Sequence, residues 1–190
     1  SHHRVMVVEL MGRYAGWLAL HAGVAAGADV ILVPEIPFDI EKVAAKCSDR
    51  SRYGRKFTII AAGEGARPVG GDVFVDRHDE SSPDPIRLGG VARWVSQQIE
   101  RLTGLESRFI VLGHVQRGGT PTPFDRVLAT RFGHQAFELL RQGRYNELVV
   151  SRKGELHSVP IADVADKVRQ VPLNYSVLQA ARGVGTSFGD

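Results

Sequence analysis

The chain has 190 residues, of which 43% are apolar and 24% charged, and its formal net charge is +3. This composition is close to the globular average and excludes a wholly disordered chain. No apolar run approaches the roughly eighteen residues of a membrane-spanning helix, and so small a net charge gives no reason to expect a nucleic-acid partner.

The kinds of charged residue and the single cysteine say more than the totals. Nineteen of the 24 basic residues are arginine, whose planar guanidinium group pairs well with carboxylates and phosphates. The lone Cys47 excludes an internal disulfide and favours a reducing, cytoplasmic setting. Residues 1–4 lack the pattern of a signal peptide. We therefore expect a cytoplasmic protein that binds anions.

Short apolar runs alternate with helical periodicity along most of the chain. Buried strands are predicted at 5–8, 30–33, 57–60 and 109–112. Helices are predicted over 15–26, after Asp39 as N-cap, over 90–103, and after Asp125 as N-cap. This alternation predicts an α/β fold, a three-layer open and mostly parallel sheet with helices on both faces.

Two segments interrupt the alternation. Residues 65–85 hold three prolines and five acidic residues, and this length without a clear element predicts a functional flap, an insertion or a partly disordered segment. After Val171 the sequence is weakly patterned and ends in several glycines, which predicts a frayed tail.

The common nucleotide and metal motifs are absent from the sequence, which has no G-x-x-x-x-G-K-[ST], no G-x-G-x-x-G after a strand and no zinc-spaced His and Cys residues. Instead, glycine-bearing turns with ionisable side chains follow three strands. Arg13 follows the first of these strands, Glu64 the second, and His114 and Arg117 the third. Open α/β sheets bind ligands at the carboxyl ends of their strands, so these four should form a pocket for a polyhydroxylated phosphoester.

The same turns carry a family resemblance. Residues 9–17 (ELMGRYAGW), 33–35 (VPE) and 113–133 (GHVQRGGTPTPFDRVLATRFG) resemble the 6-phosphofructokinase family. The resemblance places the chain as the carboxy-terminal half of such an enzyme, with a phosphofructokinase-like fold. It implies phosphorylation of fructose 6-phosphate at the 1-hydroxyl in glycolysis, with ATP or pyrophosphate as donor. Mg²⁺ would accompany the donor, held by ligands outside this chain.

The resemblance also implies a division of the chain. Residues 1–115 would form the fructose 6-phosphate-binding core, 116–172 a helix and strand of the nucleotide-binding domain, and 173–190 a tail. Phosphate loops and a catalytic aspartate would lie upstream, so the chain alone is expected to be inactive. Because its helix after Asp125 would lack partner surface, we expect exposed apolar area near Leu128 and Phe132 and some self-association.

Site roles are likewise implied by the resemblance. Arg13 would be catalytic, neutralising the phosphoryl group in transfer. His114 would bind the 6-phosphate within its own subunit, and Arg117 would lie along the substrate. The other substrate-binding candidates are Met11, Gly12 and Glu64, together with Arg4 and Arg108, which would reach the 6-phosphate of a neighbouring subunit. A homodimer or homotetramer is therefore implied.

A regulatory site is only partly matched. Compact bacterial ATP-dependent relatives use a magnesium-binding glutamate and a lysine-rich turn there, and Asp29, Arg55 and Lys56 stand at those places in this sequence. The stretch from Glu64 to Arg108 is longer than in those relatives and resembles the branch that includes pyrophosphate-dependent members. The sequence therefore does not decide between ATP and pyrophosphate as donor, nor whether the enzyme is under allosteric control.

Plainer interpretations compete with these roles. Isolated arginines are commonly surface ion-pair partners, Glu64 can cap a helix, and Met11 can simply pack. Cys47 lies on an apolar helix face, where a thiol is inert. For the whole chain the alternatives are a sugar-phosphate-binding module without chemistry and a nucleic-acid binder, the latter disfavoured by scattered arginines. We expect no nucleic-acid partner and no membrane partner.

Overall fold

The computed structural model describes residues 4–78 and 85–190. Contacts within the chain divide it into two compact units. One comprises Ser1–Arg117 together with Val168–Asp190, and the other comprises Gly118–Lys167. The first unit therefore includes the C-terminal segment as well as the N-terminal part of the chain.

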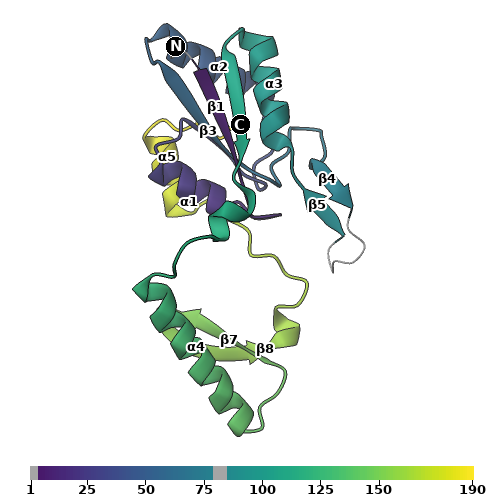
Figure 1. Ribbon diagram of the computed structural model, residues 1–190, viewed down its shortest axis with the longest axis vertical. Helices are drawn as coiled ribbons and strands as arrows, with labels where there is room; N and C mark the ends of the chain where they lie inside the picture. Colours follow the sequence, from purple (N-terminus) through teal and green to yellow (C-terminus); the bar gives the residue numbers. More distant parts are fainter. Residues whose placement is uncertain (1–3, 79–84) are drawn as a thin grey trace. The chain divides into compact units, whose positions relative to one another are not determined.

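A parallel four-stranded sheet forms the centre of the first unit (Figure 1). Its order is β2-β3-β1-β6, so the first strand lies inside the sheet between two later ones. The strands are β1 (Arg4–Leu10), β2 (Val30–Leu32), β3 (Phe57–Gly63) and β6 (Glu106–Val111). Their positions agree with the four predicted apolar runs. The predicted burial is wrong for the fourth, because β6 is an edge strand whose Phe109, Ile110 and Val111 are exposed. Parallel strands need crossover connections, and helices supply them.

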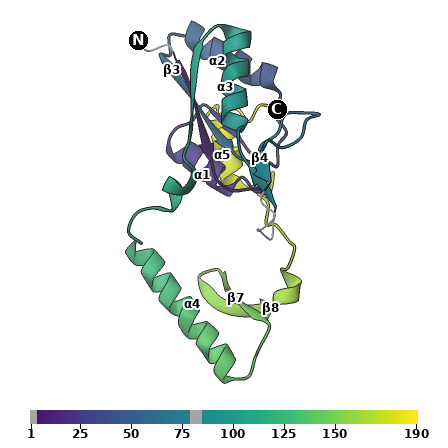
Figure 2. The same ribbon diagram turned by 45° about the vertical axis from the view of Figure 1, so that its right-hand side comes forward.

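Helices cover both faces of this sheet. Helices α2 (Ile40–Arg52) and α3 (Val91–Thr103) pack on one face, over a buried cluster that includes Val5 and Val7 of β1. Helices α1 (Trp17–Ala25) and α5 (Ser176–Gly183) lie side by side on the other face (Figure 2). Because successive side chains of a strand point to opposite faces, one strand serves both clusters. The predicted three-layer α/β fold is confirmed.

Helix boundaries follow the predicted capping chemistry in two cases. The Asp39 side chain accepts a hydrogen bond from the Glu41 backbone N–H at 2.9 Å, so the predicted N-cap of α2 is confirmed. Gly104 follows α3 with a φ of 69°, a left-handed conformation that ends helices.

The C-terminal segment is ordered, so its prediction as a frayed tail is wrong. Leu178 and Phe188 are fully buried against the α1 side of the sheet. The Ser187 carbonyl accepts a hydrogen bond from the Ile31 backbone N–H at 2.9 Å, which extends the sheet beyond β2. The segment is too short and irregular to show periodicity, yet its few apolar side chains close the hydrophobic core.

The interrupting segment 65–85 forms a hairpin in its described part. Strand β4 (Val75–His78) pairs antiparallel with β5 (Ile86–Leu88), while residues 79–84 lie outside the described residues. At the base of the hairpin, the Phe74 ring packs on Trp94 of α3 with 5.4 Å between centroids. Figure 1 shows the hairpin beside the N-terminal end of α3.

The second unit consists of one long helix and a hairpin. Helix α4 (Pro123–Arg141) packs against the antiparallel strands β7 (Glu147–Arg152) and β8 (Glu155–Pro160). Its N-cap is Thr122, whose hydroxyl accepts from the Asp125 backbone N–H, while the Asp125 carboxylate accepts from the Thr122 N–H at 2.8 Å. The prediction of Asp125 as N-cap is therefore wrong by one turn, because Pro123 starts the helix earlier.

Apolar side chains are exposed on α4 near Leu128, as predicted, since the neighbouring Val127 is 61% exposed. Phe124 and Phe137 are 72% and 61% exposed. Leu128 and Phe132 themselves are half-buried. Helix α4 thus carries apolar side chains that its own hairpin does not cover.

Cys47 belongs to α2 and is fully buried. Burial raises the pKa of its thiol to about 12, so almost no reactive thiolate forms at neutral pH. Within residues 4–78 and 85–190, no helix combines the length and the apolar character that crossing a membrane would require.

Candidate functional site

A cavity of about 880 Å³ opens at the carboxyl edge of the parallel sheet in the first unit. The turns after β1, β3 and β6, the β4–β5 hairpin and the start of α3 form its wall. Its ionisable lining residues are Glu9, Arg13, Glu64, Asp76, Arg77, Arg87, His114 and Arg117. The four residues that the sequence assigned to this edge are therefore brought together, as the strand order requires.

The turn after β1 is held by Glu64 at the end of β3. One carboxylate oxygen, Oε1, accepts hydrogen bonds from the backbone N–H groups of Gly12 at 3.1 Å and Arg13 at 2.8 Å. Arg13 has a φ of 51°, which is uncommon for a non-glycine residue. Two hydrogen bonds to one charged acceptor stabilise this conformation and fix the origin of the Arg13 side chain at the cavity.

Close approach of two turns explains the glycine after Glu64. A Cβ atom at Gly65 would lie 2.0 Å from the Arg13 carbonyl oxygen, far inside van der Waals contact. Gly12 is restricted in another way, since its φ is 148° and a Cβ there would lie 2.7 Å from the Ala15 carbonyl oxygen. Both glycines are therefore required by the local geometry of the site.

The turn after β6 is a short 3₁₀ helix, Gly113–Arg117, that carries His114 and Arg117. Its Gln116 side chain accepts a hydrogen bond from the Met11 backbone N–H at 2.8 Å, which ties this turn to the one after β1. His114 and Arg117 are both exposed at the cavity. Gln116 was missed by sequence reasoning, although its place inside the motif was a usable signal.

Glu9 is a further cavity residue that the sequence did not single out. It is 3% exposed, and its carboxylate accepts from the backbone N–H groups of Gly90 at 3.2 Å and Ala92 at 2.9 Å. A buried carboxylate at a helix N-terminus satisfies N–H groups that lack partners within the helix. Glu9 therefore fastens the end of β1 to the start of α3.

Arg77 and Arg87 of the hairpin were also missed. Both line the cavity, yet the sequence around them gave only charge and turn signals. Tertiary folding of the 65–85 segment brings them to the sheet edge, and no local periodicity could have indicated that position.

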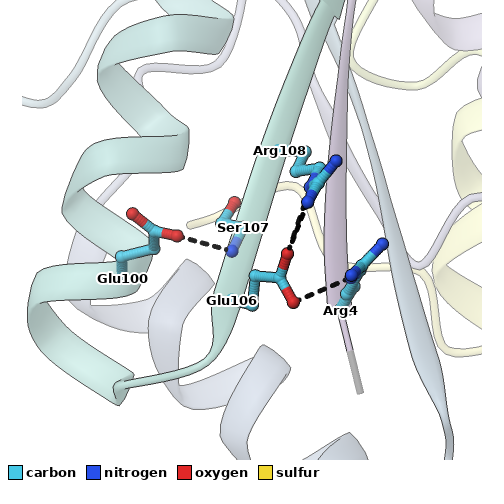
Figure 3. Close-up of polar contacts among 5 residues, drawn as sticks. All are labelled: Arg4, Glu100, Glu106, Ser107 and Arg108. Carbon is cyan, nitrogen blue, oxygen red and sulfur yellow. Dashed lines mark hydrogen bonds and ion pairs between the residues drawn. The ribbon is translucent and has the colours of Figure 1, made fainter. Parts of the chain in front are cut away.

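Arg4 and Arg108 lie elsewhere. Arg4 is the first residue of β1, and Arg108 pairs in register with Met6, so both belong to the amino-terminal part of the sheet. Figure 3 shows both guanidinium groups against Glu106, with nitrogen–oxygen distances of 2.8 Å for Arg4 and 3.0 Å for Arg108. Hydrogen bonds from Arg4 and then Arg108 lower the pKa of the Glu106 carboxyl. Neither arginine lines the cavity of its own chain.

The partial match to a regulatory site gains no support from Asp29. Its Oδ1 lies 2.9 Å from Arg50, and its Oδ2 accepts from the Ile59 backbone N–H at 2.9 Å. Both oxygens thus already have partners within the fold. Arg55 and Lys56 are exposed beside the start of β3.

The cavity can chemically hold a small negatively charged ligand. Of the three lining carboxylates, those of Glu9 and Glu64 already accept backbone hydrogen bonds and Asp76 is the third, while four lining arginines and His114 carry donor groups. A guanidinium group can donate two parallel hydrogen bonds to a phosphate. A volume of about 880 Å³ falls in the range of small-molecule sites.

Comparisons with known sequences point in one direction. The chain is 47% identical over all of its 190 residues to the ATP-dependent 6-phosphofructokinase of Chloroflexus aurantiacus, covering 51% of that protein. It is 47% identical over 171 residues, 90% of the chain, to the pyrophosphate–fructose 6-phosphate 1-phosphotransferase of Streptomyces coelicolor, covering 50% of it. The chain thus spans about half the length of the curated relatives it matches.

Solved structures and a family profile agree. The pyrophosphate-dependent phosphofructokinase of Marinobacter aquaeolei superposes with a TM-score of 0.72 at 22% identity, over 98% of this chain and 49% of that one, and so shares the fold. Phosphofructokinase from Saccharomyces cerevisiae superposes with a TM-score of 0.69 at 31% identity, over 85% of this chain and 20% of that one. The family profile described as Phosphofructokinase matches residues 1–140, and the chain belongs to this family.

Proposed function

We propose that this chain is the fructose 6-phosphate-binding, carboxy-terminal half of a 6-phosphofructokinase. The full reaction moves a phosphoryl group from ATP or pyrophosphate to the 1-hydroxyl of fructose 6-phosphate. The observation that carries the proposal is the convergence of Arg13, Glu64, His114 and Arg117 on one cavity at the carboxyl edge of the sheet. Three separate strands contribute them, which chance placement of surface arginines does not explain.

Within the cavity the proposed roles follow from chemistry. His114 and Arg117 sit on one 3₁₀ turn and donate to the 6-phosphate. Glu64 anchors the Gly12–Arg13 turn through Oε1, and its carboxylate accepts hydroxyl hydrogen bonds from the sugar. Met11 and Gly12 contact the sugar from the same turn. Arg13 neutralises charge on the phosphoryl group in transfer, the main help that this reaction needs from protein.

Arg4 and Arg108 are assigned to a neighbouring subunit's 6-phosphate. Support comes from their position, since they are at least partly exposed and lie toward the amino ends of β1 and β6, apart from their own chain's cavity. In the single chain Glu106 holds both guanidinium groups in place. The assignment implies a homodimer or homotetramer, in which Arg4 and Arg108 exchange part of their pairing with Glu106 for a phosphate.

The donor site and the catalytic base are assigned to sequence outside this chain. Magnesium would supply charge neutralisation on the donor oxygens when bound. Among the described residues no group of three or more His, Cys, Asp or Glu side chains is placed to hold a metal ion, so we assign no magnesium ligand to them. The 190-residue chain alone should show no magnesium-dependent turnover of fructose 6-phosphate with ATP or with pyrophosphate.

A thermal-shift titration tests the binding role. Fructose 6-phosphate should raise the unfolding midpoint, by an amount equal to about 2.7 kcal/mol of stability at one hundred times its dissociation constant. Inorganic phosphate and fructose, each of which carries only one part of the ligand, serve as controls and should raise the unfolding midpoint much less. His114→Ala and Arg117→Ala should remove the effect, while Arg101→Ala, outside the cavity, should keep it. Equal stabilisation by fructose, or an effect unchanged in both cavity variants, would refute the proposal.

A further inference from the structure

Glu35 lies three residues beyond β2, at the end of the V-P-E motif of residues 33–35. Its half-buried side chain accepts hydrogen bonds from two segments that are far apart in the sequence. Oε1 lies 3.0 Å from the Gly16 backbone nitrogen and 2.8 Å from that of Val171, and Oε2 lies 3.1 Å from the Gly16 nitrogen. One carboxylate therefore joins the start of α1 to the C-terminal segment.

The Gly16 contact completes the support of the turn after β1. Glu64 accepts from the N–H groups of Gly12 and Arg13 at one end of this turn, and Glu35 accepts from Gly16 at the other. Gly16 is the N-cap residue of α1 and has no side chain that could accept a hydrogen bond, and the first turn of α1 holds no acidic residue. A Cβ atom at position 16 would lie 2.7 Å from Oε2 of Glu35, so glycine is what lets the carboxylate come this close. Arg13 thus stands on a turn that is held between two carboxylates.

The Val171 contact fixes a second part of the cavity wall. Val168, three residues earlier, lines the cavity and is where the chain re-enters the first unit. Val171 itself is 2% exposed and belongs to the core cluster on the α1 side of the sheet. The Trp17 indole N–H donates to the Arg169 carbonyl at 2.7 Å, and the Arg169 guanidinium lies over the Trp17 ring, 5.4 Å from its centroid. The start of α1 therefore holds this segment at two points, one of them through Glu35.

We propose that Glu35 is a positioning residue of the cavity, whose carboxylate couples the turn that carries Arg13 to the segment that begins with Val168. Glu35 lies outside the residues that line the cavity, so it acts through these two parts of the wall and not on the ligand itself. Walls that are ordered together in advance lose less entropy when a ligand binds. The inference rests on the proposed function for the identity of the ligand, fructose 6-phosphate, and on the hydrogen bonds of Glu35 for the coupling.

Hydrogen exchange of the ligand-free 190-residue chain, measured by amide NMR, tests the coupling. Two reporters do not bond to Glu35: the Ala15 N–H, which donates to the Gly12 carbonyl at 3.1 Å, and the Tyr175 N–H, which donates to the Pro172 carbonyl at 2.9 Å. Glu35→Ala should speed exchange at both reporters about tenfold, the factor for a lost hydrogen bond to a charged group.

Two controls separate local coupling from a loss of overall stability. The Val7 amide, in the middle of the parallel sheet, exchanges on global unfolding and so reports any change in overall stability. Glu41→Ala, which removes an exposed carboxylate of α2, should change the exchange of none of the three amides. Acceleration at only one reporter, at neither, or equally at Val7 would overturn the coupling.

Calorimetric titration with fructose 6-phosphate tests the effect on the ligand. Glu35→Ala should weaken binding at least about fivefold, roughly the cost of ordering one mobile side chain on binding. Glu35→Asp keeps the charge but is one methylene too short to reach both N–H groups, so it should weaken binding as much. Glu35→Gln keeps an oxygen at the same reach and should stay within about twofold of the wild-type chain. If Glu35→Ala does not fold, the Asp and Gln variants carry the same test.

The outcomes distinguish this inference from the proposed function. Unchanged affinity in Glu35→Ala and Glu35→Asp, or equal weakening in Glu35→Gln, would overturn the positioning role while fructose 6-phosphate binding stands. Accelerated exchange at both reporters, without any binding of fructose 6-phosphate by the wild-type chain, would keep the coupling and reject the proposed function. The absence of both accelerated exchange and binding would overturn both.

Discussion

Replacing Glu64 tests whether one carboxylate oxygen organises the turn that carries Arg13. Glu64→Ala removes two hydrogen bonds, those from the Gly12 and Arg13 N–H groups to Oε1. A hydrogen bond to a charged group contributes about 1.5–3 kcal/mol. Gly12 and Arg13 are only half-buried, so water can replace the carboxylate and the lower figure applies to each hydrogen bond. The free energy of unfolding should fall by about 3 kcal/mol.

Glu64→Gln separates the oxygen from its charge. The amide oxygen can accept from both N–H groups as a neutral acceptor, so about half of the loss should return, leaving a decrease of about 1.5 kcal/mol. Urea unfolding followed by tryptophan fluorescence measures this directly, because both tryptophans of the chain, Trp17 and Trp94, lie in the first unit. Asp72→Ala, an exposed residue of the same unit, is the control. A Glu64→Ala change below about 0.5 kcal/mol, the level of ordinary surface substitutions, would refute the reasoning.

Three further predictions concern packing, ionisation and capping. Gly65→Ala should destabilise the first unit by about 3 kcal/mol in urea, since its Cβ would meet the Arg13 carbonyl at 2.0 Å. Burial raises the pKa of the Cys47 thiol from 9.0 to about 12, so the thiol ionises at lower pH in the unfolded chain than in the fold. Between about pH 9 and pH 12 the free energy of unfolding should therefore fall by up to about 1.4 kcal/mol per pH unit. Cys47→Ala should lack this slope. Thr122→Ala should cost the second unit about 1 kcal/mol by circular dichroism.

Each of these has a matched outcome that would count against it. Gly133→Ala, where a Cβ meets nothing within 4 Å inside α4, should be neutral or stabilising, and equal losses at Gly65 and Gly133 would contradict the steric argument. Identical alkaline slopes with and without Cys47 would show that its burial does not control its ionisation. A Thr122→Ser variant that loses as much as Thr122→Ala would contradict the capping box.

The central sheet could be predicted because each of its strands contains a short apolar run, although only β2 is buried along its whole length and Phe109, Ile110 and Val111 of β6 are exposed. Their glycine turns, with Arg13, Glu64, His114 and Arg117, could be placed at one edge because parallel strands end on the same side. The C-terminal segment could not be predicted in the same way. Phe188 contributes a whole buried ring from an irregular segment, and single side chains of this kind leave no periodic signal.

The positions of the β4–β5 hairpin and of Glu9 in the site also could not be predicted from the sequence. Arg77 and Arg87 reach the cavity only through tertiary folding of a segment rich in turn and acidic residues. Glu9 stands at the end of an apolar run, and its capping of α3 depends on Gly90, 81 residues further along the chain. Long-range pairings such as these are set by the assembled fold, so local sequence patterns cannot indicate them.

The most direct test of the account is to map fructose 6-phosphate binding residue by residue with amide NMR of the 190-residue chain. We expect the largest shifts on amides of the cavity wall, such as Gly12 and Gly113, and we expect His114→Ala to remove them. Amides of the second unit, Gly118–Lys167, should not move. Largest shifts within that unit, or shifts at Gly12 and Gly113 that persist in His114→Ala, would contradict a sugar-phosphate site at the carboxyl edge of the sheet.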